Sequence, residues 1–339
     1  KFQRLIPTIT EIEAKRAHHI VDVEWEGLRP REGLPVARSG QFSAWIPIMF
    51  GCNNFCTYCI VPYVRGRERS RQPEDILQEI RQAAHAGFRE ITLLGQNVNS
   101  YGKDHRLADF SDLLKMADEV EGIERIRYMT SHPKDLSHKL IETVRDSQHI
   151  CEHFHIPVQY GNDRILRAMN RGYTIERYRD LVQEIRENVP DASITTDLIV
   201  GFPGEEEEDF AALLDFVKEM RYDAAYTFLY STRSGTPAAT MEHQIPLKVK
   251  KERLHRLMDI QDRISREVND RYRERTVEVM VEGPSANRPD VWMGRTRTNK
   301  IVLWEHQSES PGDMVNVMIT SPQTWLLKGI LVDTKSMKK

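Results

Sequence analysis

Six short apolar runs alternate with longer amphipathic segments between residues 44 and 273, and this alternation restricts the possible folds more than any other feature. Apolar runs of about four to eight residues are typical of buried strands, whereas longer segments with a 3.6-residue period are typical of helices. Six strand–helix units in succession predict a parallel α/β sheet; eight would close a barrel, and six make an open or partial one. The apolar runs cover residues 45–50, 91–94, 125–129, 153–158, 194–200 and 224–230.

The amphipathic segments carry ordinary helix signals. One begins at Pro73, a favoured first helical residue, continues with two acidic residues and stops at Gly87. Another follows Asp109, and further helices are expected over residues 136–144, 174–188, 205–220 and 247–273. The last of these is long and charged, and we expect it to close the domain.

After residue 273 the apolar period changes from 3.6 to 2, with alternation over residues 277–282 and again over 315–319. Glycine and proline residues between these runs supply turns, so a small β-barrel of about 65 residues is predicted. Residues 271–339 carry a net charge of +3, while the whole chain carries −3. This contrast fits an RNA-binding appendage, although an ordinary, slightly basic barrel would look the same.

The four cysteines are Cys52, Cys56, Cys59 and Cys151, and the first three form a C-x-x-x-C-x-x-C pattern directly after the first predicted strand. So few cysteines exclude a disulfide framework and indicate a reducing compartment. Thiolates suit zinc or iron–sulfur clusters, and a structural zinc site normally has four ligands. Three thiolates leave one iron of a [4Fe–4S] cubane open, and that iron can bind S-adenosylmethionine. A zinc site completed by a histidine is the alternative, and Cys151 is interpreted as a buried, inert thiol.

This cysteine pattern is the hallmark of the radical S-adenosylmethionine (radical SAM) superfamily, which the chain resembles. The resemblance narrows to the methylthiotransferases over residues 51–71, 130–133, 157–174 and 197–205. Residues 94–102 (LGQNVNSYG) are similar to the tRNA-modifying branch, the MiaB group. Residues 294–300 and 312–320 are similar to the TRAM domain of these enzymes.

The resemblance implies a partial (β/α)6 barrel followed by a small all-β TRAM barrel. The expected boundaries are 1–43 for a linker or remnant of a preceding domain, 44–272 for the radical SAM core and 273–339 for the TRAM domain. The resemblance further implies that a methylthio group is added to carbon 2 of an isopentenylated adenosine next to the tRNA anticodon. Members use two S-adenosylmethionine molecules, one as methyl donor and one as radical source.

Members of this family begin with a further domain of about a hundred residues, whose three cysteines bind a second [4Fe–4S] cluster. The chain has no cysteines for that cluster and no starting methionine. We therefore expect it to lack the N-terminal domain, to bind one cluster and to be unable to insert sulfur alone.

Candidate ligands and contacts follow from the motifs and from their positions after the strands. The cluster ligands are expected to be Cys52, Cys56 and Cys59. Contacts to the cofactor are expected from Tyr58, Gln96, Asn97, Gln159, Asp197, Gly201, Phe202 and Pro203. Contacts to RNA phosphates are expected from Arg65, Arg67, Arg69, Arg71, Arg295, Arg297 and Lys300. The arginines of residues 65–71 could instead form a solvated loop, residues 201–204 a simple turn, and Gln96 with Asn97 a capped loop. No catalytic residue is assigned.

The expected partners are a tRNA anticodon stem-loop and an electron donor such as flavodoxin or ferredoxin. No window of 18 or more apolar residues occurs, so no membrane partner is expected, and the protein is expected to be a cytoplasmic monomer. Two other functions remain open. One is methylthiolation of threonylcarbamoyl-adenosine in tRNA or of a ribosomal protein aspartate; the other is a metal-stabilised RNA-binding module without catalysis.

Overall fold

The computed structural model describes residues 2–14, 19–21, 38, 40, 42–104, 108–286 and 288–332. The chain divides into two units, residues 1–35 and 36–339. In the first unit, helix α1 spans Phe2–Glu13 and contains Pro7. From the sequence we expect only a linker or remnant there, and most of residues 15–43 lies outside the described residues.

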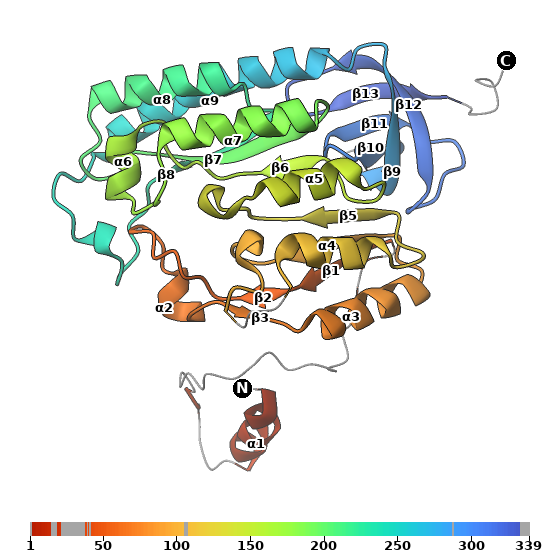
Figure 1. Cartoon of the computed structure of the whole chain (residues 1–339), viewed down its shortest axis with the longest axis horizontal. Helices are drawn as coiled ribbons and strands as arrows, with labels where there is room; N and C mark the ends of the chain where they lie inside the picture. The colour runs from red at the N-terminus through yellow and green to blue at the C-terminus, as the bar shows by residue number, and fades with distance from the viewer. Residues whose placement is uncertain are drawn as a thin grey trace. The chain divides into compact units, whose positions relative to one another are not determined.

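Six parallel strands form the first part of the second unit, as predicted (Figure 1). Strands β1, β4 and β5 pair in that order, and β6, β7 and β8 pair in that order. A parallel bridge between Ile126 and Ile150 joins the two groups. The strands are β1 (Ser43–Pro47), β4 (Glu90–Leu94), β5 (Arg125–Tyr128), β6 (His153–His155), β7 (Ser193–Val200) and β8 (Ala224–Leu229).

A helix follows each of the first five strands, and the long helix α9 follows β8. Side chains of Asp109, Ser137 and Thr174 cap three of these helices by accepting backbone N–H groups. Apolar side chains on one face of each strand pack against the helices in a single core. The helices are α3 (Pro73–His85), α4 (Phe110–Asp118), α5 (His138–Asp146), α7 (Ile175–Asn188), α8 (Glu207–Met220) and α9 (Leu247–Asp270).

Several short elements are not predicted from the sequence. The first apolar run is divided into β1 and β2 (Met49–Phe50), and β2 pairs with β3 (Arg69–Ser70) to form a hairpin that carries the cysteine segment. Helices α2 (Val61–Arg65) and α6 (Asp163–Ala168) and the 3₁₀ turns η1 (Val98–Ser100), η2 (Pro133–Asp135) and η3 (Pro237–Ala239) are also too short to show a period.

Residues 276–331 form a closed five-stranded barrel in the order β10-β11-β13-β12-β9, which confirms the predicted second barrel. Its small core contains four valines, Trp304, Ile319 and Leu327. At Gly294 a Cβ atom would lie 2.2 Å from the carbonyl oxygen of Met280, so only glycine allows β9 and β10 to approach this closely. The strands are β9 (Thr276–Ser285), β10 (Arg288–Thr296), β11 (Ile301–Glu305), β12 (Met314–Pro322) and β13 (Leu327–Leu331).

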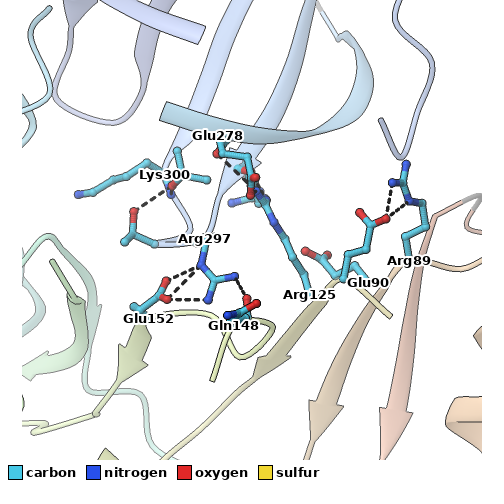
Figure 2. Close-up of polar contacts among 12 residues, drawn as sticks. Arg89, Glu90, Arg125, Gln148, Glu152, Glu278, Arg297 and Lys300 are labelled. Atoms are coloured by element: carbon cyan, nitrogen blue, oxygen red, sulfur yellow. Dashed lines mark hydrogen bonds and ion pairs between the residues drawn. The ribbon is translucent and has the colours of Figure 1, made fainter. Parts of the chain in front are cut away.

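The barrel contacts the amino ends of the core strands through the turn between β10 and β11 (Figure 2). At the start of β5, Arg125 donates to the carbonyl oxygen of Arg295 at 2.6 Å and to Glu278 Oε1 at 3.0 Å. Arg127 donates to the carbonyl oxygens of Thr296 and Arg297 at 2.8 and 3.1 Å. We call this set of contacts, together with the ion pairs of Arg297 and Lys300 described below, the junction.

Candidate active site

A cavity of about 370 Å³ lies where the cysteine segment meets the carboxyl ends of the core strands. In parallel α/β folds this end of the strands carries the functional loops. The lining comes from the cysteine segment and the start of α2, from residues on or just after β4, β5, β6 and β7, and from Arg171 after α6. It consists of Cys52, Asn54, Cys56, Tyr58, Cys59, Val61, Gly95, Gln96, Thr130, Ser131, His132, Pro157, Gln159, Arg171 and Asp197.

The cysteine segment begins at a position that only glycine can occupy. Gly51 has φ +75°, and a Cβ atom there would lie 2.2 Å from the carbonyl oxygen of Arg67. The next residue, Cys52, donates its N–H to the carbonyl oxygen of Gly66 at 3.1 Å. Asn53 and Glu68 exchange three further hydrogen bonds across the same gap. The β2–β3 hairpin therefore holds the start of the segment in one conformation.

A second anchor joins the cysteine segment to the residues around the end of α6. Thr57 donates its N–H to the carbonyl oxygen of Met169 and its hydroxyl to that of Ala168, at 3.1 and 2.9 Å. The side-chain amide of Asn170 donates to the carbonyl oxygen of Phe55 at 3.1 Å. The segment is thus fixed at both ends before any cofactor binds.

The three cysteines line the cavity, with Cys56 buried and the other two half-buried. Burial raises the pKa of the Cys52 and Cys59 thiols. Within the described residues, no three His, Cys, Asp or Glu side chains are grouped to hold one metal ion.

Two buried polar atoms in the cavity lining have no hydrogen-bond partner among the described residues. They are Gln96 Oε1 and His132 Nε2. His132 Nδ1 accepts the N–H of Lys134 at 3.3 Å, and burial lowers the pKa of His132 to about 2. The ring is therefore neutral with its proton on Nε2, so it offers an unused donor to an occupant of the cavity.

Backbone strain is concentrated at the same place. Phe55, Thr130 and Gln159 have φ values of +47°, +69° and +71°. Each such residue costs on the order of 1–3 kcal/mol, and a β-branched residue such as Thr130 tolerates this region poorly. Strain of this kind persists at functional sites, where the surrounding structure enforces it.

The predicted cofactor contacts divide into two groups. Tyr58, Gln96, Gln159 and Asp197 line the cavity, whereas Asn97 lies behind it. The Asn97 side chain accepts the N–H of His132 at 3.0 Å and donates to Asp135 Oδ2 at 2.7 Å. Asn97 therefore holds the loop of His132 in place.

The predicted residues Gly201, Phe202 and Pro203 are absent from the cavity lining among the described residues. Glu205 Oε2 accepts the N–H groups of Gly201 and Phe202, while Glu205 Oε1 pairs with Arg253 at 2.7 Å. The ring of Phe202 is fully buried against Tyr230. Through these contacts the turn joins β7 to α8 and α9.

The predicted RNA contacts after the cysteine segment also differ from one another. Arg65 and Arg67 are exposed, and the guanidinium of Arg67 lies 4.3 Å from the centre of the Phe55 ring. Arg69 donates to the carbonyl oxygen of Arg65. Arg71 is buried and pairs with Glu79 at 2.8 Å. Only the first two present their charge openly to solvent beside the cavity.

Each of the three predicted RNA contacts in the barrel forms an ion pair with a carboxylate. Arg297 pairs with Glu152 at 2.6 Å and also donates to the carbonyl oxygen of Ile150 (Figure 2). Lys300 pairs with Asp223 at 2.8 Å. Arg295 pairs with Glu282 of the barrel at 2.8 Å. The first two pairs join the barrel to the core.

Arg171, a buried member of the cavity lining, was not predicted from the sequence. It lies within the methylthiotransferase-like stretch 157–174, but neither its spacing nor its neighbours in sequence indicate that it reaches the cysteines. The missing signal is tertiary, because α6 brings residue 171 back to the segment that ends at residue 59.

Comparison with known proteins identifies both parts of the chain. Residues 46–217 match the radical SAM superfamily, and residues 270–332 match the TRAM domain. The chain is 55% identical over 302 residues to a tRNA-2-methylthio-N(6)-dimethylallyladenosine synthase of Desulforamulus reducens, covering 89% of this chain and 66% of that protein. It is 52% identical over 332 residues to the synthase of Moorella thermoacetica, covering 98% and 74%. The chain belongs to the radical SAM methylthiotransferases.

Solved structures support the fold. Escherichia coli coproporphyrinogen III oxidase (HemN), a radical SAM enzyme, matches with a TM-score of 0.51 at 16% identity over 76% of this chain and 67% of that one. The radical SAM methyltransferase TsrM of Kitasatospora setae matches with a TM-score of 0.50 at 18% identity, covering 62% and 42%. The chain spans about two thirds of the length of the curated relatives that it matches. Membership of this family implies a [4Fe–4S] cluster and S-adenosylmethionine.

Proposed function

We propose that this chain is the radical-generating and RNA-binding part of an enzyme that adds a methylthio group to carbon 2 of N6-isopentenylated adenosine in tRNA. The observation that carries the proposal is the convergence of three thiols in one cavity at the carboxyl ends of the core strands. The names of relatives more than 50% identical supply the substrate.

The lining of the cavity fits a cluster with one open iron. Cys52, Cys56 and Cys59 would each bind one iron, and Tyr58, Gln96, Gln159 and Asp197 would contact the bound cofactor. When bound, the cluster and S-adenosylmethionine supply a 5′-deoxyadenosyl radical, which is needed because the adenine C–H bond is inert to polar chemistry. The neutral ring of His132 would donate a hydrogen bond into the cavity.

Aromatic side chains on the inner face of β8 provide a surface for the base. Tyr226 and Phe228 expose 53% and 49% of their surface, while Ala225 and Leu229 pack against the helices. Tyr226 pairs in register with Asp197 of the cavity lining, and its ring lies edge-on to His155, 5.7 Å between centroids. Proteins hold single unstacked bases by stacking them on such rings. We therefore assign the substrate base to this surface.

We infer that RNA phosphates are bound by Arg65 and Arg67 beside the cavity and by the exposed surface of the barrel. Arg297 and Lys300 would fix the barrel to the core, in place of the RNA contacts that the sequence predicts for them. The described helices include none that is long and apolar enough to cross a membrane. A cytoplasmic monomer that receives electrons from flavodoxin or ferredoxin, with domain boundaries near residues 43 and 272, completes the proposal.

Anaerobic reconstitution tests the proposal at the level of the chain. We expect about four irons per chain and cleavage of S-adenosylmethionine to 5′-deoxyadenosine under reducing conditions. Cys56→Ala should abolish both, whereas the matched variant Cys151→Ala should retain both, because Cys151 lies away from the cavity. Seven to eight irons per wild-type chain would refute the single cluster.

The substrate is tested with an anticodon stem-loop that carries N6-isopentenyladenosine. Mass spectrometry should detect the 2-methylthio product only when a domain carrying the second cluster is supplied. A product on threonylcarbamoyl-adenosine RNA, and none on the isopentenylated RNA, would contradict the proposed substrate.

A further inference from the structure

Arg171 carries a buried positive charge that no described carboxylate neutralises. The residue is 5% exposed, and the groups that act on its charge are Tyr58, Tyr173 and Cys56. Its guanidinium donates to Cys56 Sγ at 3.4 Å, to the carbonyl oxygen of Pro157 at 2.6 Å and to the Tyr173 hydroxyl at 3.1 Å. All of these acceptors are neutral while the Cys56 thiol is protonated.

The other buried arginines show how this fold normally handles such a charge. Within the part of the chain that the structure describes, each of the other four pairs with a carboxylate at 2.6–3.0 Å. The pairs are Arg71–Glu79, Arg125–Glu278, Arg127–Glu90 and Arg253–Glu205. An uncompensated buried charge costs several kcal/mol, so Arg171 requires an anion that the protein chain itself does not supply.

The position of Arg171 identifies that anion. Its Nη1 contacts the sulfur of Cys56, and it lines the same cavity as the other two thiols. When Cys56 binds iron it does so as a thiolate, so the ligand and the cluster together carry negative charge next to the guanidinium.

We propose that Arg171 neutralises the thiolate of Cys56 and thereby raises the reduction potential of the cluster. One-electron reduction by an external low-potential donor adds one negative charge to the cluster, transfers no proton and breaks no bond. A positive charge and an N–H donor at a ligand sulfur stabilise the reduced state more than the oxidised state. The inference rests on the proposed function only in taking the cluster as the occupant of the cavity.

Another anion in the cavity would be the carboxylate of S-adenosylmethionine. The hydrogen bond from Arg171 to Cys56 Sγ favours the cluster, because this bond is present in the protein chain without a bound cofactor. A measurement made without S-adenosylmethionine separates the two, since only the cluster is then present.

The test is an EPR-monitored redox titration of the reconstituted chain without S-adenosylmethionine, for wild type, Arg171→Gln and Arg171→Lys. The matched control is Arg167→Gln, which removes the same charge from an exposed position on α6. At the wild-type midpoint potential, Arg171→Gln should have a ratio of reduced to oxidised cluster at least tenfold lower, which corresponds to a midpoint about 59 mV more negative. The midpoint potential of Arg171→Lys should lie between those of wild type and Arg171→Gln, and the midpoint of Arg167→Gln should equal that of wild type.

An unchanged midpoint in Arg171→Gln would overturn the inference, and weaker binding of S-adenosylmethionine in that variant would then assign Arg171 to the cofactor's carboxylate. If Arg171→Gln fails to take up iron, Arg171→Met is titrated in its place, and a midpoint equal to that of wild type in this uncharged variant overturns the inference. Failure of the proposed function has a different signature, namely absence of iron or of cofactor cleavage in wild type.

Discussion

Lys300 is predicted from its sequence motif to bind RNA, but the structure places its ammonium in an ion pair with Asp223 at the junction. The two side chains expose 9% and 6% of their surface, and the Nζ–Oδ1 distance is 2.8 Å. Burial lowers the pKa of Lys300, and the Asp223 carboxylate opposes that shift. Lys300→Met keeps much of the side-chain volume and removes the charge, so it leaves Asp223 buried without its closest partner.

The cost of this substitution can be estimated from what remains around Asp223. Removing one member of a buried ion pair costs about 3–5 kcal/mol of unfolding free energy. Asp223 keeps a hydrogen bond from the N–H of Ile194 at 3.0 Å, and the exposed Arg271 lies 3.8 Å away. Because of these two contacts, we expect the cost to lie at the lower end of this range, about 3 kcal/mol. The melting temperature should therefore fall by about 5 °C, because the unfolding entropy of a unit as large as residues 36–339 is high.

Thermal and urea unfolding followed by circular dichroism measure this effect on the chain without cofactors. The control is Arg288→Met, which breaks a pair with Asp290 whose two side chains are each 63% exposed, and it should leave the midpoints unchanged. The double variant Lys300→Met with Asp223→Asn should recover much of the loss, because no buried charge then remains. Equal midpoints for Lys300→Met and the control would refute the reasoning, as would loss of tRNA affinity at unchanged stability.

Three further predictions concern the cavity and its surroundings. Because the unfolded chain binds a proton at His132 near pH 6.5 and the folded chain does so only near pH 2, stability should fall as pH decreases through this window. His132→Asn should reduce that loss by about 2 kcal/mol between pH 7.5 and 5 in urea unfolding; an unchanged pH profile would contradict the buried neutral ring. Arg67→Ala should lower the slope of log affinity against log salt for tRNA by about one, with no change in melting temperature; an unchanged slope would remove Arg67 from the RNA interface. Phe228→Ala should reduce affinity for the isopentenylated stem-loop by about 1–3 kcal/mol relative to Met258→Ala on α9, as measured by fluorescence anisotropy. Equal affinities of the two variants would contradict the assignment of the base to β8.

The parallel core was predictable because its strands are buried on both faces or on the helix side. Such strands appear in sequence as short apolar runs, and each run has a clear helical segment after it. The β2–β3 hairpin was not predictable, since two-residue strands such as Met49–Phe50 show no period. Helix α1 was missed because residues 1–43 show no sustained apolar period, and Pro7 lies inside the helix.

The cavity was partly predictable for a geometric reason. The carboxyl ends of parallel strands meet at one edge of the sheet, so residues directly after the runs, such as Gln96 and Gln159, come together with the cysteines. Whether a basic side chain is free depends instead on distant partners. Arg297 meets Glu152, 145 residues earlier in the chain, and Arg171 meets Cys56, 115 residues earlier. No local pattern contains that information.

Strand β5 connects the two ends of the core. At its start, Arg125 and Arg127 bind backbone carbonyl groups of the barrel at distances of 2.6–3.1 Å. Three residues later the chain reaches Thr130–His132 in the cavity lining. The junction also includes the residues just before β6 and β8, through Glu152 and Asp223. Charges buried at several strands resist sliding or rotation of the barrel, because any displacement would leave more than one of them unpaired. Under the proposed function, an RNA bound to the barrel would be held at a defined distance from the cysteines. The length of RNA between its barrel contact and the modified base would then determine which adenosine reaches the aromatic surface of β8.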